Sequence, residues 1–180
     1  MPWKDGGGVT EQIAIEPPDA TLAGGFLWRL SMARVERPGP FSRFEGCDRT
    51  LMLLEGGGLD LDFGAHGRLL VESPMQPVAF SGDWEARATL TRGPVRDLGV
   101  ISDRARVRQE VRVLALDGGP VPIPPASTAW IIALTGRCVL EPWDLELEPL
   151  EAARLDGEAA EVRGLSRNAR CLLVRLEARS

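Results

Sequence analysis

The chain has very few of the residues that usually carry metal and acid–base chemistry. Its 180 residues include one histidine, His66, and three cysteines. A metal site built on imidazole ligands needs two or more histidines, so composition excludes such a site. Asp60 and Asp62 could form a site of carboxylates alone, but they alternate with leucines, and the simpler interpretation is the solvated face of a strand. We therefore expect no metal and no cofactor, and we expect His66 to be an exposed turn residue.

The three cysteines, Cys47, Cys138 and Cys171, are far apart in the chain and form no CxxC pair. Such spacing indicates neither a zinc site nor a disulfide framework. Reduced thiols are typical of cytosolic proteins, so we expect a cytoplasmic location.

Long apolar runs and long runs of one charge are also missing. No run approaches the ~18 apolar residues that a membrane span requires. No basic and then apolar segment opens the chain, so export is not expected. The net charge is −5 and there is no basic tail, so nucleic acid is not expected as a partner.

Motifs of nucleophilic catalysis and of phosphate binding are absent as well. The chain has no GxSxG elbow and no GxxxxGK(S/T) loop. Ser31, Ser42 and Cys47 would act as nucleophiles only if Lys4 or His66 lay close enough to serve as the base.

Glycine and proline, by contrast, are abundant and spread along the whole chain, with 20 and 14 residues. They separate short apolar runs, which is the pattern of an all-β sandwich or barrel. Residues 104–108 and 152–154 would form at most a helical turn. The expected strands are residues 9–15, 26–35, 49–54, 59–63, 78–80, 86–90, 95–101, 109–116, 128–134, 138–140 and 171–176.

Two parts of the chain repeat the same order of features: a strand that begins with threonine, a turn with aspartate, and a final strand. These features are Thr50, Asp83 and Leu98–Val100 in the first part, and Thr128, Asp156 and Leu172–Val174 in the second. The repeat predicts two related β units, and its rhythm is that of a cupin (RmlC-like) jelly roll. We expect a bicupin with units at residues 1–105 and 106–180, the second packed tightly against the first.

The N-terminal segment is the first candidate for binding an anion. Lys4 is the only lysine among 21 basic residues. It precedes Gly6–Gly8, a run that can adopt positive φ and present successive N–H groups. The alternative is that this segment is a flexible lead into the first strand.

Arginines on two expected strands form the second candidate. Arg29 and Ser31 share a strand face, opposite the face of Trp28 and Leu30, and Arg49 shares a face with two leucines. If these faces line a barrel, Lys4, Arg29 and Arg49 surround a cavity. Buried cations need partners, which Asp97 or a small carboxylate ligand would supply. The alternative is that Arg–Asp ion pairs only brace the barrel.

Several separate motifs resemble those of the HutD/Ves family, closely over the first 100 residues and through strand rhythm beyond. They are Trp3–Thr10, Trp28–Ala33, Gly39–Gly46, Asp48-Arg49, Leu53–Gly56, and Phe80 with Asp83. The resemblance implies a cytosolic two-cupin protein whose genes are often associated with histidine utilisation. Taking the residue patterns and these motifs together, we expect a ligand site formed by Lys4, Asp5, Gly7, Thr10, Arg29, Ser31, Phe41, Ser42, Arg49 and Asp97.

The chain departs from the family pattern at three motif positions. The family usually has Asn at the position of Asp5, Glu at that of Gln12, and Asn at that of Gly99. These changes remove amide and carboxylate groups, so they leave the identity of the ligand open.

Three functions are compatible with these observations. The first is a metal-free cupin that binds a small anionic metabolite, such as formylglutamate or urocanate, in a regulatory or accessory role. The second is a metal-independent isomerase or hydrolase that uses Lys4, with its pKa lowered by burial or by neighbouring arginines. The third is a structural or interaction protein without a ligand. We favour the first, which is not an enzyme, and exposed sheet edges make a homodimer compatible with this fold.

Overall fold

The computed structural model describes residues 7–22 and 25–179, and strands dominate throughout. Their contacts divide the chain into two compact units, residues 1–107 and 108–180. The prediction of an all-β fold is therefore confirmed. Within the described residues, no helix is long and apolar enough to cross a membrane.

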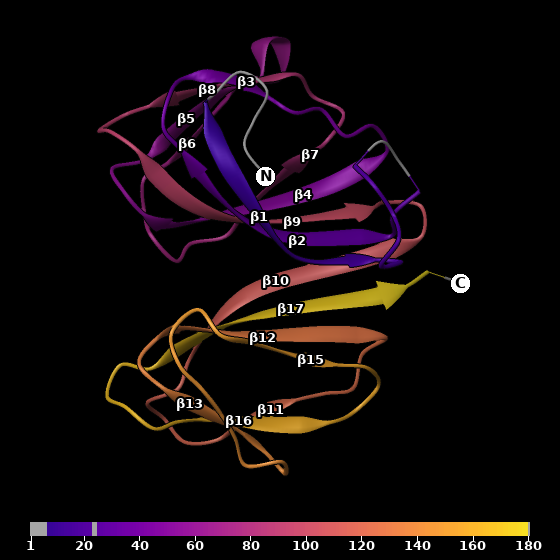
Figure 1. The fold of residues 1–180 in the computed structure, drawn as a ribbon, viewed down its shortest axis with the longest axis vertical. Coiled ribbons are helices and arrows are strands. Elements are labelled where there is room, and N and C mark those ends of the chain that lie inside the picture. The colour runs from indigo at the N-terminus through magenta and orange to yellow at the C-terminus, as the bar shows by residue number, and fades with distance from the viewer. Residues whose placement is uncertain (1–6, 23–24, 180) are drawn as a thin grey trace. The chain divides into compact units, whose positions relative to one another are not determined.

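The first unit consists of two antiparallel sheets (Figure 1). One sheet has the strand order β1-β2-β9-β4-β7, and the other has the order β3-β8-β5-β6. Their bounds are β1 Gly8–Glu16, β2 Trp28–Val35, β3 Gly39–Phe41, β4 Cys47–Glu55, β5 Leu59–Asp62, β6 Arg68–Val71, β7 Val78–Ser81, β8 Ala86–Leu90 and β9 Val95–Asp103, with a short 3-10 turn, η1, at Gly64–His66.

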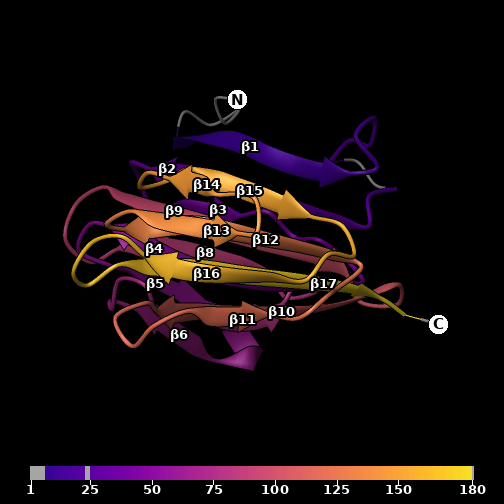
Figure 2. The same ribbon diagram turned by 90° about the horizontal axis from the view of Figure 1, so that it is seen from below.

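The second unit repeats this plan with two four-stranded sheets, β10-β17-β12-β15 and β11-β16-β13-β14. In Figure 2, the strands of each of these two sheets follow one another in this order from the bottom of the view to the top. Their bounds are β10 Val107–Ala115, β11 Val121–Ile123, β12 Thr128–Thr135, β13 Cys138–Glu141, β14 Leu145–Leu147, β15 Ala152–Leu155, β16 Ala160–Gly164 and β17 Arg170–Ala178.

The sequence repeat corresponds to the same strand pairing in both units. Thr50 lies on β4, which pairs antiparallel with β9 and with β7. Thr128 lies on β12, which pairs antiparallel with β17 and with β15. The aspartate turns follow β7 and β15 directly. Each unit therefore places the threonine strand between the final strand and the strand that precedes the aspartate.

Local pattern gave the wrong structure for residues 152–154. They form part of β15, which pairs with β12 through Ile132 opposite Ala152 and Trp130 opposite Arg154. The segment is too short to show a strand period by itself, and the neighbouring strand decides its conformation. The sequence pattern also missed β11, which contains Pro122. A proline is tolerated there because β11 is the edge of its sheet and the missing N–H breaks no ladder bond.

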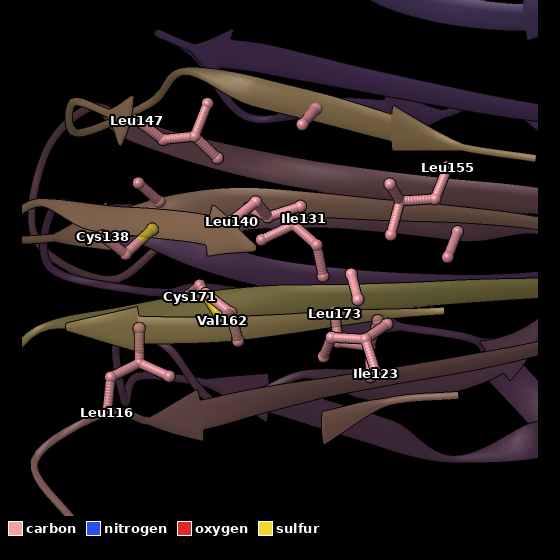
Figure 3. Packing of buried hydrophobic residues seen from close by; sticks show 14 of the residues in the cluster. Leu116, Ile123, Ile131, Cys138, Leu140, Leu147, Leu155, Val162, Cys171 and Leu173 are labelled. Atoms are coloured by element: carbon pink, nitrogen blue, oxygen red, sulfur yellow. The ribbon is translucent and has the colours of Figure 1, made fainter. Parts of the chain in front are cut away.

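The interior of the second unit is a continuous apolar core (Figure 3). Its members come from both sheets, including Ile131 on β12, Leu140 on β13 and Leu173 on β17. Cys138 and Cys171 are buried in the same cluster as free thiols. Apart from its two thiols, this cluster consists of apolar side chains.

Candidate functional site

The interior of the first unit differs because polar residues divide its apolar core. Val95, Asp97, Gly99 and Ile101 lie at every second position of β9 and therefore share one face of the strand. Val95 belongs to one buried cluster, with Leu51, Leu53 and Phe63 among its members. Ile101 belongs to another, with Ile15, Phe26 and Cys47. Asp97 and Gly99 lie between the two clusters, so the chain leaves a polar region inside this barrel.

Strand register brings two arginines to this region from two strands. Arg29 on β2 and Arg49 on β4 are both paired with Ile101, one on each side of β9. Ser31 is paired with Gly99 in the next inward-facing row. The predicted shared face of Arg29 and Ser31, and that of Arg49 and the leucines of β4, therefore line the same interior.

Arg29 is a buried cation whose hydrogen bonds are incomplete. Its side chain is only 5% exposed, and its Nε donates to Oε1 of Gln12 at 3.1 Å. Its Nη2 is buried and finds no hydrogen-bond partner in the described part of the chain. Burial lowers the pKa of the guanidinium, because the charged form has lost its water.

Arg49 is half-buried in a cage of three aromatic rings. Its Nη1 donates to the backbone carbonyl of Ser42 at 2.7 Å. Its guanidinium carbon lies 4.9 Å from the ring centre of Phe41, 5.0 Å from that of Phe80 and 5.2 Å from that of Phe44. Burial lowers its pKa to about 10, so the group keeps its charge at neutral pH.

Asp97 is the buried acid of the region. It is 3% exposed, and its Oδ2 has no hydrogen-bond partner within residues 7–22 and 25–179. Burial raises the pKa of the carboxyl to about 7, although the charge of Arg49 acts in the opposite direction. An Arg–Asp ion pair at Asp97 is one form of the bracing alternative, and Oδ2 of Asp97 forms none within the described residues.

Gly99 leaves open space beside these groups. A Cβ atom placed there would have only one described atom within 4 Å, Oγ of Ser31 at 3.9 Å. Ser31 is itself buried. The interior surface between the arginine row and Asp97 therefore has a glycine and a small hydroxyl side chain, with space for at least one more carbon atom.

Of the site residues predicted near the N-terminus, the structure describes Gly7 and Thr10. Lys4 and Asp5 lie outside the described residues. Gly7 accepts, through its carbonyl, the N–H groups of Glu36 and Arg37 at 2.8 and 3.3 Å, and Gly8 already belongs to β1. Thr10 is half-buried and paired with Ala33.

Two predicted residues act through Arg49. Ser42 is exposed and contributes its backbone carbonyl to Arg49, and Phe41 contributes its ring. Phe44 was not predicted as a site residue, and neither was Phe80, although both lie within matched motifs. Phe80 is paired with Arg49 across β4 and β7, and that register is not visible in the sequence.

Arg104 stabilises the loop between β3 and β4, which carries Phe44 of this aromatic cage. It donates to Asp48 at 2.6 Å, to Asp83 at 2.8 Å, to the carbonyl of Cys47 at 2.7 Å and to Ser81 Oγ at 2.9 Å. The N–H of Gly46 and Arg104 hold the pKa of Asp83 low, at about 2. Three motif residues, Gly46, Asp48 and Asp83, thus fix the loop between β3 and β4.

His66 lies on η1, exposed, and its ring stacks on Trp84 with 4.9 Å between centroids and an interplanar angle of 10°. The prediction of an exposed turn residue agrees with this position. Among the described residues, no group of three or more His, Cys, Asp and Glu side chains is arranged to hold a metal ion.

The second unit has a surface groove of about 720 Å³. Proline, isoleucine and alanine residues line it, together with the charged residues Arg112, Glu141 and Glu161. None of the three charged residues is buried. The groove therefore lacks the buried, unpaired donor and acceptor found in the interior of the first unit.

Comparison with known proteins gives one consistent family. The family model described as HutD matches residues 1–173. The chain is 34% identical over 183 residues, covering 99% of this chain and 93% of the relative, to an uncharacterized 21.2 kDa protein in the hutC 3′ region of Pseudomonas putida. It is 37% identical over 112 residues to protein Ves of Citrobacter koseri, which covers 62% of this chain and 56% of that protein.

Solved structures agree with the sequence relatives. HutD from Pseudomonas fluorescens SBW25 (formate condition) superposes with a TM-score of 0.85 at 29% identity, covering 100% of this chain and 94% of that chain. A cupin 2 conserved barrel protein from Leptotrichia buccalis superposes with a TM-score of 0.64 at 11% identity, covering 94% and 89%. The second likeness shows the fold alone, and it confirms the predicted cupin architecture.

Proposed function

The chain belongs to the HutD family and has a two-unit cupin-like fold, and from this premise we propose that its first barrel binds a small metabolite through a carboxylate. The proposed site consists of Arg29, Arg49, Ser31 and Asp97, with Phe41 beside Arg49. No imidazole takes part, because the one histidine is stacked on Trp84.

The observation that carries this proposal is the pair of arginines beside Ile101, one of which is incompletely bonded. A buried donor without a partner costs free energy, and a charged donor costs more. A carboxylate would accept a hydrogen bond from Nη2 of Arg29. Its negative charge would also compensate the positive charge of the guanidinium, which burial has removed from water. Guanidinium groups suit this recognition because they bind carboxylates in a bidentate manner.

The family supports a ligand from histidine breakdown. One relative is named for its place in the hutC 3′ region. Formylglutamate and urocanate are carboxylates of that breakdown, and we propose them as the first candidates. Binding without turnover would suit an accessory or regulatory role.

Thermal unfolding in the presence of ligands tests the proposal. A ligand that binds only the folded state stabilises it by about 2.7 kcal/mol at a hundredfold excess over its dissociation constant. We expect formylglutamate, urocanate or another small carboxylate to raise the melting temperature by several degrees. Arg29→Met and Arg49→Met should abolish the increase.

Arg34→Met is the matched control, because Arg34 lies on the same strand as Arg29 but is exposed and paired with Glu36. It should leave the ligand effect unchanged. If no carboxylate shifts unfolding, or if Arg29→Met keeps the full shift, the arginines serve the fold alone.

A further inference from the structure

The interior of the first unit holds a buried acceptor as well as a buried donor. Asp97 is 3% exposed and Arg29 is 5% exposed. Asp97 Oδ2 and Arg29 Nη2 both lack a hydrogen-bond partner in the described part of the chain. Burying one unpaired polar group costs free energy. An unpaired donor and an unpaired acceptor in the same barrel therefore indicate a ligand that forms hydrogen bonds with both.

The two groups stand at opposite ends of one row of inward-facing residues. Arg29 and Arg49 are both paired with Ile101, and Asp97 lies four positions earlier on β9. Four residues of strand span about 13 Å between Cα atoms. Between them lies Gly99, with space above its Cα that only Ser31 Oγ approaches among the described atoms. The interior is therefore bipolar, with cations at one end and a carboxyl at the other.

Among the residues that the structure describes, the neighbouring walls offer Asp97 no ion-pair partner. From β1, the positions that face this row are Thr10 and Gln12, which are uncharged. From the opposite sheet, the core residues Leu59, Leu61 and Ala88 are apolar. Burial raises the pKa of Asp97, and the charge of Arg49 on β4 acts against this rise.

A plain carboxylate ligand would complete only half of this arrangement. It would accept from the arginines but leave Asp97 Oδ2 without a donor, and it would bring a second negative charge toward an ionised carboxyl. A ligand with a carboxylate at one end and a neutral N–H or O–H group farther along would satisfy both ends.

Building on the proposed carboxylate site, we infer that Asp97 is a specificity-determining residue, selecting carboxylates that also carry a neutral hydrogen-bond donor, as in N-acyl amino acids and hydroxy acids. The donor of the ligand meets Oδ2 of Asp97, while Arg29 and Arg49 hold the carboxylate. Ligands with a plain hydrocarbon chain in the same place are rejected.

Matched pairs of ligands that differ only by an N–H in place of a CH2 test this inference on the wild-type protein. The pairs are N-acetylglycine with 4-oxopentanoate, N-acetyl-β-alanine with 5-oxohexanoate, and 4-acetamidobutyrate with 6-oxoheptanoate. Titration calorimetry at pH 8, where Asp97 is largely ionised, gives each dissociation constant. We expect the amide of the best-fitting pair to bind about tenfold to a hundredfold more tightly, as hydrogen bonds to charged groups allow.

Variants then assign the discrimination to Asp97. Asp97→Leu should bring the ratio within the best pair close to one, and Asp97→Asn, which keeps a neutral acceptor, should give an intermediate ratio. Glu11→Gln is the control, because Glu11 is an exposed acid on β1, and it should leave the ratio unchanged. The wild-type comparison stands even if a variant fails to fold.

Three results overturn the inference in distinguishable ways. Equal binding within every pair means that Asp97 does not select a donor, while the carboxylate site itself stands. Equal binding that weakens about tenfold for each pH unit above 7 means that Asp97 is protonated and donates to the carboxylate. If no member of any pair binds, and formylglutamate and urocanate do not bind either, the proposed function fails together with the inference.

Discussion

Arg29 and Arg49 lie on opposite sides of β9, each paired in register with Ile101. The two strands that carry them, β2 and β4, are separated in the sequence by a segment that includes β3, so only sheet formation brings them together. Their surroundings differ: Arg29 is buried with an Nη2 that has no partner among the described residues, whereas Arg49 is half-buried against three rings. The protein itself supplies the contacts of the Arg49 guanidinium, whereas Nη2 of Arg29 is available to bind a ligand group.

Arg49→Lys should destabilise the fold by about 1–2 kcal/mol. Lysine lacks the planar fork that bonds the Ser42 carbonyl while lying over aromatic rings. Urea unfolding measures the change, with Arg34→Lys as control. Arg34 is exposed, and its substitution should change stability by less than about 0.5 kcal/mol. Equal stability of the Arg49→Lys variant and the wild type would show that the cage contributes nothing.

Asp97→Asn should stabilise the protein above neutral pH. The folded pKa of Asp97 is raised from its ordinary value to about 7, so the folded state binds more protons than the unfolded state between pH 4 and 7. The stability of the wild type therefore falls as pH rises through this range and levels off above it. The asparagine variant has no carboxyl group to ionise, so its free energy of unfolding does not fall in this way. The difference from the wild type amounts to about 2–4 kcal/mol at pH 8.

Urea unfolding of both proteins at pH 4.5, 6 and 8 measures this effect. The difference between variant and wild type should be small at pH 4.5 and largest at pH 8. A difference that grows as the pH falls would mean that Asp97 is stabilised as an anion, against the burial argument.

Arg104→Met should weaken the loop between β3 and β4. The substitution removes bonds to two carboxylates, a hydroxyl and a carbonyl. Because the Arg104 side chain is 39% exposed, solvent screens the charges, and we expect a loss of about 1–2 kcal/mol. Hydrogen exchange of residues 42–47 should accelerate, while Arg87→Met, an exposed change on β8, should leave it unaltered. Unchanged exchange in Arg104→Met would count against the proposed tie.

The thiols of the second unit should be inert in the folded protein. Burial raises the pKa of Cys138 to about 11 and that of Cys171 to about 12, so almost no thiolate exists at pH 8. A thiol reagent at that pH should modify neither residue until denaturant is added. Rapid modification of Cys171 in the native state would show that the core of Figure 3 opens readily.

The sequence by itself determined which residues share a strand face, and it excluded a metal site built on several histidines. Alternation along β2 placed Arg29 and Ser31 on one face, and alternation along β4 placed Arg49 with Leu51, because side-chain direction has a period of two residues in any strand. A single histidine excluded a site built on several imidazoles. The motifs in the first 100 residues indicated the HutD/Ves family, and the full-length family match agrees.

Only the tertiary structure decided how these faces meet. The pairing of both arginines with Ile101, the position of Phe80 beside Arg49, and the strand at residues 152–154 depend on partners far along the chain. Register and desolvation are set by such distant partners, which no local pattern encodes. For the same reason, the structure rather than the sequence showed that Asp97 is buried, with Oδ2 unpaired in the part of the chain that the structure describes.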